Sequence, residues 1–256
     1  MKQLSFIVLV LAFLAGHAHA ITAVPNPNLP KPPSASVTNL PARIWENSLS
    51  FGLTLTRGNS DTILTAAGFK THRLDLTNEV LLTIDGSYGK SGTTKNNEAL
   101  HGAGQYNHLF SDRFYCYLRG EGLHDDVADL SYRFTVSPGV GYYFIKNKEM
   151  TLAVEAGPGG VFEKLDGSSK NYAAARFAQR LERKWNAHAR VWETLEFLPQ
   201  FDQSKNFLFN AEIGVETALT RKISLRTVLR DNFINLPAPG RKQNDLKLIS
   251  GVVYKF

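Results

Sequence analysis

One cluster of side chains in this sequence has the groups that acid–base chemistry requires. His124, Asp125, Asp126 and Asp129 lie close together in a stretch that we expect to be a loop. An imidazole beside carboxylates can transfer protons as a general acid or base, and carboxylates also suit hard cations such as Ca²⁺. Aspartate is equally typical of solvated turns, where its side chain bonds the backbone. We therefore predict a loop here, and no catalytic or metal-binding residue.

The other residues of catalytic type have no partners at a useful spacing. A barrel phospholipase needs a serine close to a histidine on the same strand face, and no histidine beyond the first twenty residues has one. Those histidines are His72, His101, His108, His124 and His188. Gly157-x-Gly159-Gly160 lacks the helix and lysine of a phosphate-binding loop, and glycine in a strand more often marks a bend or bulge. The sequence thus predicts no enzyme activity and no cofactor.

Charged residues at alternate positions in the C-terminal third form the strongest candidate site. Arg226 and Arg230 lie on the expected strand next to that of Glu212 and Glu216, so facing charges would form ion-pair ladders. Such ladders would brace a barrel of narrow bore; alternatively, they would line a narrow channel that favours anionic solutes. Acids nearly match bases, which favours bracing. The predicted lumen set is Arg176, Arg180, Arg190, Arg226, Arg230 and Lys247, with Glu182, Glu196, Glu212 and Glu216.

Alternation of apolar and polar residues predicts the elements that carry these side chains. It begins near Trp45 and is clearest in residues 49–55, 207–216 and 223–230. A period of two places the two sets on opposite faces of a strand, and most segments are long enough to cross a bilayer at a tilt. The expected strands are 45–57, 62–72, 79–89, 98–109, 113–124, 130–143, 149–162, 171–183, 187–198, 206–219, 222–234 and 244–256.

The connections between these strands predict the orientation of the barrel. After the first two hairpins, short turns alternate with longer loops. Outer-membrane barrels have tight periplasmic turns and longer external loops, with both termini on the periplasmic side when the strand count is even. The short turns are expected at 111–112, 147–148, 186 and 221–222, and the longer loops at 125–129, 164–170, 199–205 and 235–243.

The N-terminal residues predict export. Lys2 precedes an apolar run over residues 4–14, and residues 18–20 have the small-x-small pattern of a signal-peptidase site. The run is too short to span a bilayer as a helix, and an N-terminal membrane anchor is the alternative. We expect residues 1–20 to be a cleaved signal peptide. Residues 21–44 hold six of the eleven prolines and are expected to be a periplasmic linker, because proline resists helix and sheet.

Composition argues against other classes of protein. No later stretch approaches about eighteen consecutive apolar residues, which excludes a helical membrane protein. The formal net charge of +6 could indicate nucleic acid, but the cations never form a run, and we predict no nucleic-acid partner. The single cysteine, Cys116, excludes an intramolecular disulfide.

The C-terminus carries the most specific local signal. Phe256 is the last residue, and Tyr254 and Val252 share its face. A terminal aromatic on an alternating strand resembles the signal read by the outer-membrane β-barrel assembly machinery, so we expect that machinery and outer-membrane lipid as partners. Closure would leave no unpaired strand edge in lipid. Aromatic residues near strand ends are expected in interfacial girdles: Trp45, Tyr88, Tyr106, Tyr115, Tyr132, Tyr142, Tyr143 and Tyr254.

Several motifs, in order and spacing, resemble one known family over nearly the whole chain from residue 45. They are Gly58-Asn59-Ser60, Asp126, Leu130-x-x-Arg133, Gly139-x-Gly141-Tyr142-Tyr143-Phe144, Glu155-x-Gly157-Pro158-Gly159, Asp245 and Tyr254-Lys255-Phe256. Together they resemble the DUF481 family, often labelled salt-induced outer-membrane proteins (YdiY-like). The resemblance implies an outer-membrane β-barrel and no established activity, because the family's label is a placeholder.

These observations predict an all-β protein. Residues 45–256 are expected to form a transmembrane antiparallel up-and-down β-barrel of about twelve strands, in the outer membrane of a Gram-negative-type cell. Its expected role is a non-enzymatic barrel of the cell envelope, structural or stress-related. A narrow porin-like channel for small anionic solutes is the alternative, and a barrel enzyme with an acid–base site at its rim is a third hypothesis.

Overall fold

The computed structural model describes residues 44–56 and 62–256 of the chain. The predicted signal peptide (1–20), the predicted linker up to residue 43 and the Gly58-Asn59-Ser60 motif lie outside these residues. In the part described, the regular secondary structure consists of strands, and no helix is long and apolar enough to cross a membrane.

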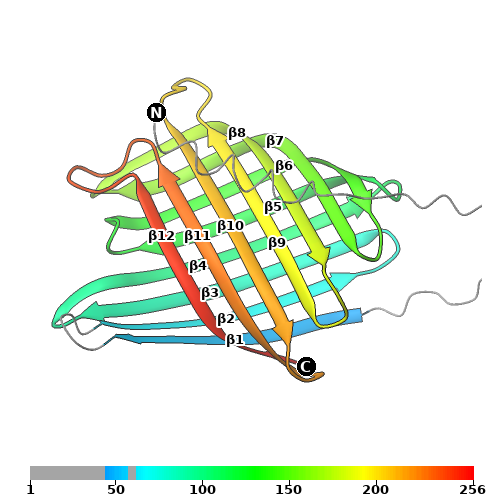
Figure 1. The fold of residues 1–256 in the computed structure, drawn as a ribbon. Helices are drawn as coiled ribbons and strands as arrows, with labels where there is room; N and C mark the ends of the chain where they lie inside the picture. The colour runs from blue at the N-terminus through cyan, green and yellow to red at the C-terminus, as the bar shows by residue number, and fades with distance from the viewer. Residues whose placement is uncertain (1–43, 57–61) are drawn as a thin grey trace, which may run out of the picture. The chain divides into compact units, whose positions relative to one another are not determined.

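Twelve antiparallel strands close into one barrel, in which consecutive strands pair and β1 also pairs with β12 (Figure 1). The predicted fold class and strand number are therefore confirmed. The strands are β1 (Ile44–Thr56), β2 (Thr62–Leu74), β3 (Asn78–Ser91), β4 (Thr94–Leu109), β5 (Phe114–Asp125), β6 (Leu130–Lys146), β7 (Met150–Leu165), β8 (Ser168–Lys184), β9 (Ala189–Pro199), β10 (Phe207–Ala218), β11 (Ile223–Ile234) and β12 (Asn244–Lys255).

Alternation along each strand gives the wall two faces of opposite character. On β3, Leu82 and Ile84 lie exposed on the outer face, whereas Asp85 points into the lumen and meets Arg230. On the other strands too, alternate residues point outward and inward. Most exposed aliphatic and aromatic side chains lie outside, and most buried charges lie inside. This distribution is the reverse of that in a soluble protein, where apolar side chains fill the interior.

The five described turns at the end of the barrel where β1 begins share one capping pattern. In each turn, one polar side chain accepts hydrogen bonds from the backbone N–H groups two and three residues further on. The capping residues are Asp75, Ser111, Asn147, Asn186 and Thr220. Because Asx and Ser/Thr turns satisfy the backbone locally, the chain reverses within a few residues at this end.

The connections at the opposite end are more varied, and one of them contradicts the prediction. The longer loop expected at 164–170 is wrong, because β7 continues to Leu165 and β8 begins at Ser168. Asp166 and Gly167 alone join the two strands, with φ angles of 49° and 71°. Positive φ at both central residues suits a two-residue hairpin turn. Polar residues on both sides of the turn had obscured the strand ends in the sequence.

The predicted aromatic girdles need a correction at two positions. Tyr115 and Tyr143 face the lumen and are buried, with exposed fractions of 0% and 6%. Tyr143 directly follows the outward Tyr142, and neighbouring residues of a strand must point to opposite faces. The other members of the predicted set lie exposed on the outside: Trp45, Tyr88, Tyr106, Tyr132, Tyr142 and Tyr254.

The seam between β1 and β12 closes the barrel through a pair of glycines. Gly52 and Gly251 face each other in the register of the two strands. A Cβ added at Gly251 would lie 2.8 Å from the carbonyl carbon of Phe51 and 2.9 Å from the Cα of Gly52. The two strands can therefore approach this closely only because neither glycine carries a side chain.

Gly251→Val should weaken the seam. Overpacked side chains typically cost about 1–3 kcal/mol, so the folded barrel should lose its fast gel mobility at a lower temperature than the wild type. Gly120→Val is the matched control, because a Cβ at Gly120 meets no atom within 4 Å. Equal melting of the two variants in a heat-modifiable mobility series would contradict the role assigned to Gly251.

Candidate functional site

The lumen holds the largest concentration of charged side chains that the structure describes. Glu216 on β10 lies at the centre of one group and is 2% exposed. Its carboxylate meets Arg226 Nη2 at 2.8 Å and Arg190 Nη2 at 3.0 Å, and Lys255 Nζ at 2.5 Å. Arg190 also lies 3.4 Å from Glu182. Three cations thus converge on one buried carboxylate near the seam.

A second ion pair lies four residues along the same two strands, β10 and β11. In the register of β10 and β11, Glu212 faces Arg230 and Glu216 faces Arg226. Arg230 Nη2 donates to Glu212 Oε2 at 2.9 Å, and the Trp192 indole donates to the other oxygen of Glu212 at 2.8 Å. These are the residues that the sequence places on adjacent strands, and the structure brings their side chains together.

A third group lies around Glu155 on β7, which is 1% exposed. Its two oxygens accept hydrogen bonds from Arg176 Nη1, Gln105 Nε2 and the Tyr115 hydroxyl, each at 2.8 Å. Arg180 Nη2 lies 3.1 Å away. A buried carboxylate is tolerated only when it is paired and fully hydrogen-bonded, and Glu155 meets this condition.

Three ion pairs join side chains from strands that are far apart around the wall. One is Lys247 of β12 with Asp125 of β5, at 3.2 Å and five positions apart. Arg230 on β11 donates to Asp85 on β3 at 3.0 Å, and these strands are four positions apart in the order of the barrel. Arg119 on β5 lies 3.7 Å from Glu196 on β9, again four positions apart. Such pairs cross the lumen rather than follow its wall.

The crossings by Arg230 and Arg119 connect the local groups into one chain of charges, called the lumen network below. His101 lies between Asp85 and Glu121, at 3.1 Å and 3.2 Å, and Arg119 also pairs with Glu121. Arg176 Nε then joins Glu196 to the Glu155 group at 2.6 Å. In order, the members are Glu212, Arg230, Asp85, His101, Glu121, Arg119, Glu196, Arg176, Glu155 and Arg180.

Half of the lumen network was absent from the set predicted from sequence. Five members were not among the candidates, although each occupies one of the alternate positions of its strand that point inward. They are Asp85, His101, Glu121, Arg119 and Glu155. The alternation was therefore the signal that could have found them. It could not have shown which of them meet across the lumen.

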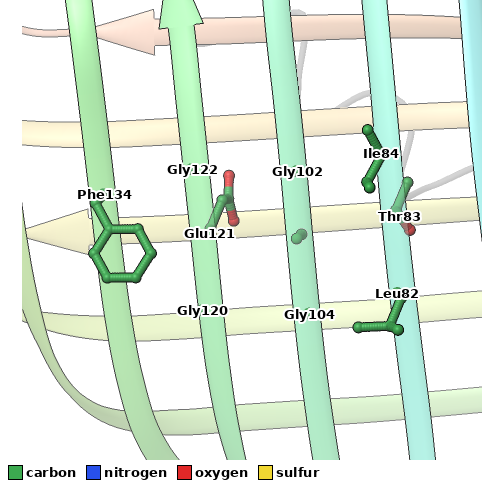
Figure 2. A pocket seen from close by; sticks show the side chains of 10 residues that line it. Leu82, Thr83, Ile84, Gly102, Gly104, Gly120, Glu121, Gly122 and Phe134 are labelled. Carbon is green, nitrogen blue, oxygen red and sulfur yellow. The ribbon is translucent and has the colours of Figure 1, made fainter.

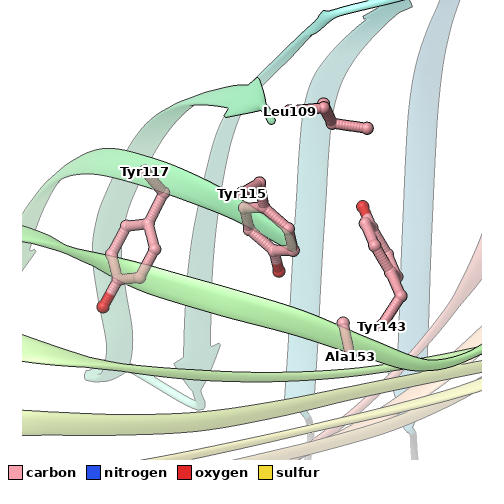
Figure 3. Close-up of a cluster of buried hydrophobic side chains, with 5 residues drawn as sticks. All are labelled: Leu109, Tyr115, Tyr117, Tyr143 and Ala153. Carbon is pink, nitrogen blue, oxygen red and sulfur yellow. The ribbon is translucent and has the colours of Figure 1, made fainter. Parts of the chain in front are cut away.

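Tyrosine side chains occupy the lumen beside β4 to β7 (Figure 3). The rings of Tyr115 and Tyr143 lie 5.0 Å apart, and the Tyr143 hydroxyl donates to Glu79 at 3.1 Å. A Cβ at Gly141 would overlap the Tyr115 ring, and a Cβ at Gly139 would overlap that of Tyr117. The glycines thus give the rings room to lie against the wall. Leu109 and Ala153 complete this cluster.

The loop between β11 and β12, residues 235–243, reaches the opposite side of the barrel. Ala238 is 4% exposed and packs against Leu130 of β6 and Leu165 of β7. Arg241 Nε lies 2.5 Å from Asp129 in the loop that precedes β6. Since β6 and β12 are six positions apart in a barrel of twelve, this loop crosses one mouth of the lumen.

The acid–base cluster considered from sequence lies at the same mouth. His124, Asp126 and Asp129, with Asp166, line a hollow of about 280 Å³. Hydrogen bonds from Lys95 and Arg241 hold the pKa values of Asp126 and Asp129 below the usual value of aspartate. Each of these two carboxylates therefore already has a cationic partner.

The remaining members of that cluster are also engaged. His124 Nδ1 lies 2.9 Å from the carbonyl oxygen of Ser131. Asp125 points inward and meets Lys247 at 3.2 Å, and Lys247 also pairs with Asp245 at 2.8 Å. Among residues 44–56 and 62–256, no group of three or more His, Cys, Asp or Glu side chains is arranged to hold a metal ion.

Comparison with known proteins gives a family and a set of similar folds. The family described as "Protein of unknown function, DUF481" matches residues 49–256. The NanC porin has 7% identity and a TM-score of 0.50, over 82% of this chain and 98% of that one. An outer-membrane channel from Pseudomonas putida F1 has 8% identity and a TM-score of 0.49, over 85% and 97%. No curated protein sequence matched. At 7% identity, the likeness to the NanC porin concerns the fold alone.

Arg241→Gln should loosen the loop across the mouth. The loop would lose its charged link to Asp129 and keep the packing of Ala238 and the hydrogen bonds of Asn235 to Lys205 and Phe207. Backbone amides around Arg241 should therefore exchange hydrogen severalfold faster. Lys242→Gln is the matched control, since Lys242 is exposed and makes no ion pair in the structure described. Unchanged exchange in the Arg241 variant would show that the pair does not hold the loop.

Acid should produce the same loosening in the wild type. Because Arg241 lowers the pKa of Asp129, the pair contributes fully above the ordinary aspartate pKa of about 3.9 and is lost as the pH falls through the lower folded value. Protection of the loop in the wild type should therefore fall toward that of Asp129→Asn as the pH drops below about 4. Hydrogen exchange of both proteins at matched pH measures this, and a constant difference at low pH would contradict it.

Proposed function

This chain belongs to the DUF481 family, and we propose that it is an outer-membrane barrel whose lumen is closed to free diffusion, a non-enzymatic component of the cell envelope. The observation that carries this proposal is the lumen network, which crosses the interior twice. The two other structures in the lumen point the same way. The tyrosine cluster occupies one side of it, and loop 235–243 crosses one mouth.

The outer wall supports a location in a membrane. Large apolar side chains are exposed on many strands, among them Phe51 at 62%, Ile84 at 57% and Leu248 at 61%. Monomeric soluble proteins rarely expose so much contiguous apolar surface. A closed sheet also leaves no unpaired backbone edge, which is what a hydrocarbon environment demands.

The charges of the lumen network support closure more than anion transport. Acidic and basic members alternate strictly along the chain of contacts and occur in equal number. A selective anion pathway would instead present an excess of unpaired cations. In this lumen the positive charge of each guanidinium is largely cancelled by a neighbouring carboxylate.

A narrow channel is the second candidate, and one observation favours it. Several network members are partly exposed inside the lumen, with side-chain fractions of 26% for Arg230 and 19% for His101. Partly wetted ion pairs are weak, so small displacements could open a path. The rim cluster has less support as an enzyme site, because Asp126 and Asp129 already have cationic partners.

Removal of the two crossings that belong to the lumen network should open the lumen. The charge-neutral variant Asp85→Ala, Arg230→Ala, Arg119→Ala and Glu121→Ala should give stable conductance steps in planar bilayers, whereas the wild type should give none. Lys95→Ala with Glu98→Ala is the control, because this pair lies at the rim and outside the lumen network. Wild-type steps as large as those of the variant would overturn closure and support the channel.

Ion selectivity separates the two candidates further. Glu212→Gln with Glu216→Gln removes the carboxylate partner of Arg226 and of Lys255. It also removes one of the two partners of Arg190 and one of the two partners of Arg230. Each lost pair should lower the free energy of unfolding by on the order of 1 kcal/mol or less. If the barrel conducts, its reversal potential across a salt gradient should shift toward anion selectivity, and further Arg226→Gln and Arg230→Gln changes should reverse the shift. A selectivity indifferent to all four changes would remove these residues from any conduction path.

A further inference from the structure

The outer wall contains a hollow that no side chain fills. Gly102 and Gly104 of β4 face Gly122 and Gly120 of β5 in the strand register. All four lie on the outer face, and with neighbouring residues they line a hollow of about 400 Å³ (Figure 2). The backbones of two adjacent strands thus form its floor.

Apolar side chains surround this floor. In the register of β3 to β6, Gly102 pairs with Ile84 on one side and with Gly122 on the other, and Gly122 pairs with Phe134. Ile84 and Phe134 therefore flank the two glycines. Leu82 of β3 pairs in the same way with Gly104. Figure 2 shows the side chains of Leu82 and Ile84 on one side of the glycines and Phe134 on the other. The hollow is therefore a basin within the apolar outer face.

At three of these four positions, neither conformation nor crowding requires glycine. At Gly104, a Cβ would lie 3.0 Å from Leu82 Cδ2, so the Leu82 side chain would have to shift. None of the four has a positive φ. A Cβ at Gly120 would meet no atom within 4 Å, and at Gly102 and Gly122 the nearest atoms lie 3.9 Å and 4.0 Å away. Glycine in a strand costs roughly 0.5–1 kcal/mol relative to alanine. At Gly102, Gly120 and Gly122, the open space itself is therefore the feature that glycine provides.

We propose that this hollow binds the terminal segment of a phospholipid acyl chain, an inference that rests on the membrane location proposed above. The basin is continuous with the exposed apolar face that would contact lipid. Gly120 lies midway along β5 (Phe114–Asp125). In a hydrocarbon core about 30 Å thick, that height corresponds to the middle of the bilayer, where chain ends meet.

The shape of the hollow argues against a second copy of the chain as occupant. A two-fold contact places the same surface patch on both partners. With the two-fold axis through the basin, two basins would face each other and enclose a void twice as large, whose lining would lose its contacts. A flexible hydrocarbon chain can instead adapt to the floor and the rim of a single basin.

Photocrosslinking tests the proposal on the full mature chain. The protein would be reconstituted in phosphatidylcholine vesicles that contain phosphatidylcholine with a diazirine at the end of one acyl chain. After irradiation, crosslinked peptides are mapped by mass spectrometry. Crosslinks should concentrate on residues 82–84, 102–104, 120–122 and 134, severalfold above the rest of the outer wall.

Filling the basin should abolish this preference. Gly102→Leu with Gly120→Leu should lower crosslinking at the basin severalfold and leave other outer positions unchanged. Ala173→Leu with Ala175→Leu is the matched control, because these residues lie on the outer face of β8, away from the basin. If the leucine variant loses the fast gel mobility of a folded barrel, Gly120→Ala with Gly122→Ala replaces it, with a smaller decrease expected.

The remaining outcomes separate the two proposals. Crosslinks spread evenly over the outer wall, or unchanged in the filled variants, would overturn the acyl-chain site and leave the membrane barrel intact. Basin crosslinks that fall as the protein-to-lipid ratio rises, while crosslinks elsewhere on the wall stay constant, would overturn it in favour of a second copy. An absence of lipid crosslinks anywhere on the wall would instead refute the membrane location itself.

Discussion

Closure of the sheet on itself is the constraint on which the rest of this structure depends. Every strand must pair on both sides, so β1 has to meet β12, and the Gly52–Gly251 contact lets the two approach. Once the sheet is closed, successive side chains of each strand point alternately to the outer wall and into the lumen. The position of a residue along its strand therefore decides which of the two faces it lies on. The outer face carries apolar side chains, whereas the lumen carries paired charges.

The lumen has to satisfy its own polar groups. A charge withdrawn from water is costly unless it is paired and hydrogen-bonded. Glu155 meets this demand with three hydrogen-bond donors and a second guanidinium 3.1 Å away. The strict alternation of acid and base along the lumen network follows from the same demand. A barrel of twelve strands is narrow enough for arginine side chains to reach across it, so satisfying the charges also obstructs the interior.

Glycine serves three different purposes in this fold. At the seam and beside Tyr115 and Tyr117, an added Cβ would overlap neighbouring atoms, so glycine allows close packing. In the turn between β7 and β8, Gly167 supplies a positive φ. At three basin positions on the outer wall, Gly102, Gly120 and Gly122, glycine neither relieves a clash nor permits a special backbone angle, and its effect is to leave space on the surface.

The sequence by itself predicted about twelve strands, the alternation of faces along several of them, and the neighbourhood of Glu212 and Glu216 with Arg226 and Arg230. These depend on a period of two and on chain order, which are local properties. Local patterns also misled, since polar residues around Asp166-Gly167 suggested a long loop, and nearness to strand ends suggested a girdle role for Tyr115 and Tyr143. Only the tertiary structure decided that Arg230 meets Asp85, that loop 235–243 reaches Asp129, and that four glycines share one basin. These contacts depend on register, strand tilt and the circumference of the closed sheet, which no short stretch of sequence specifies.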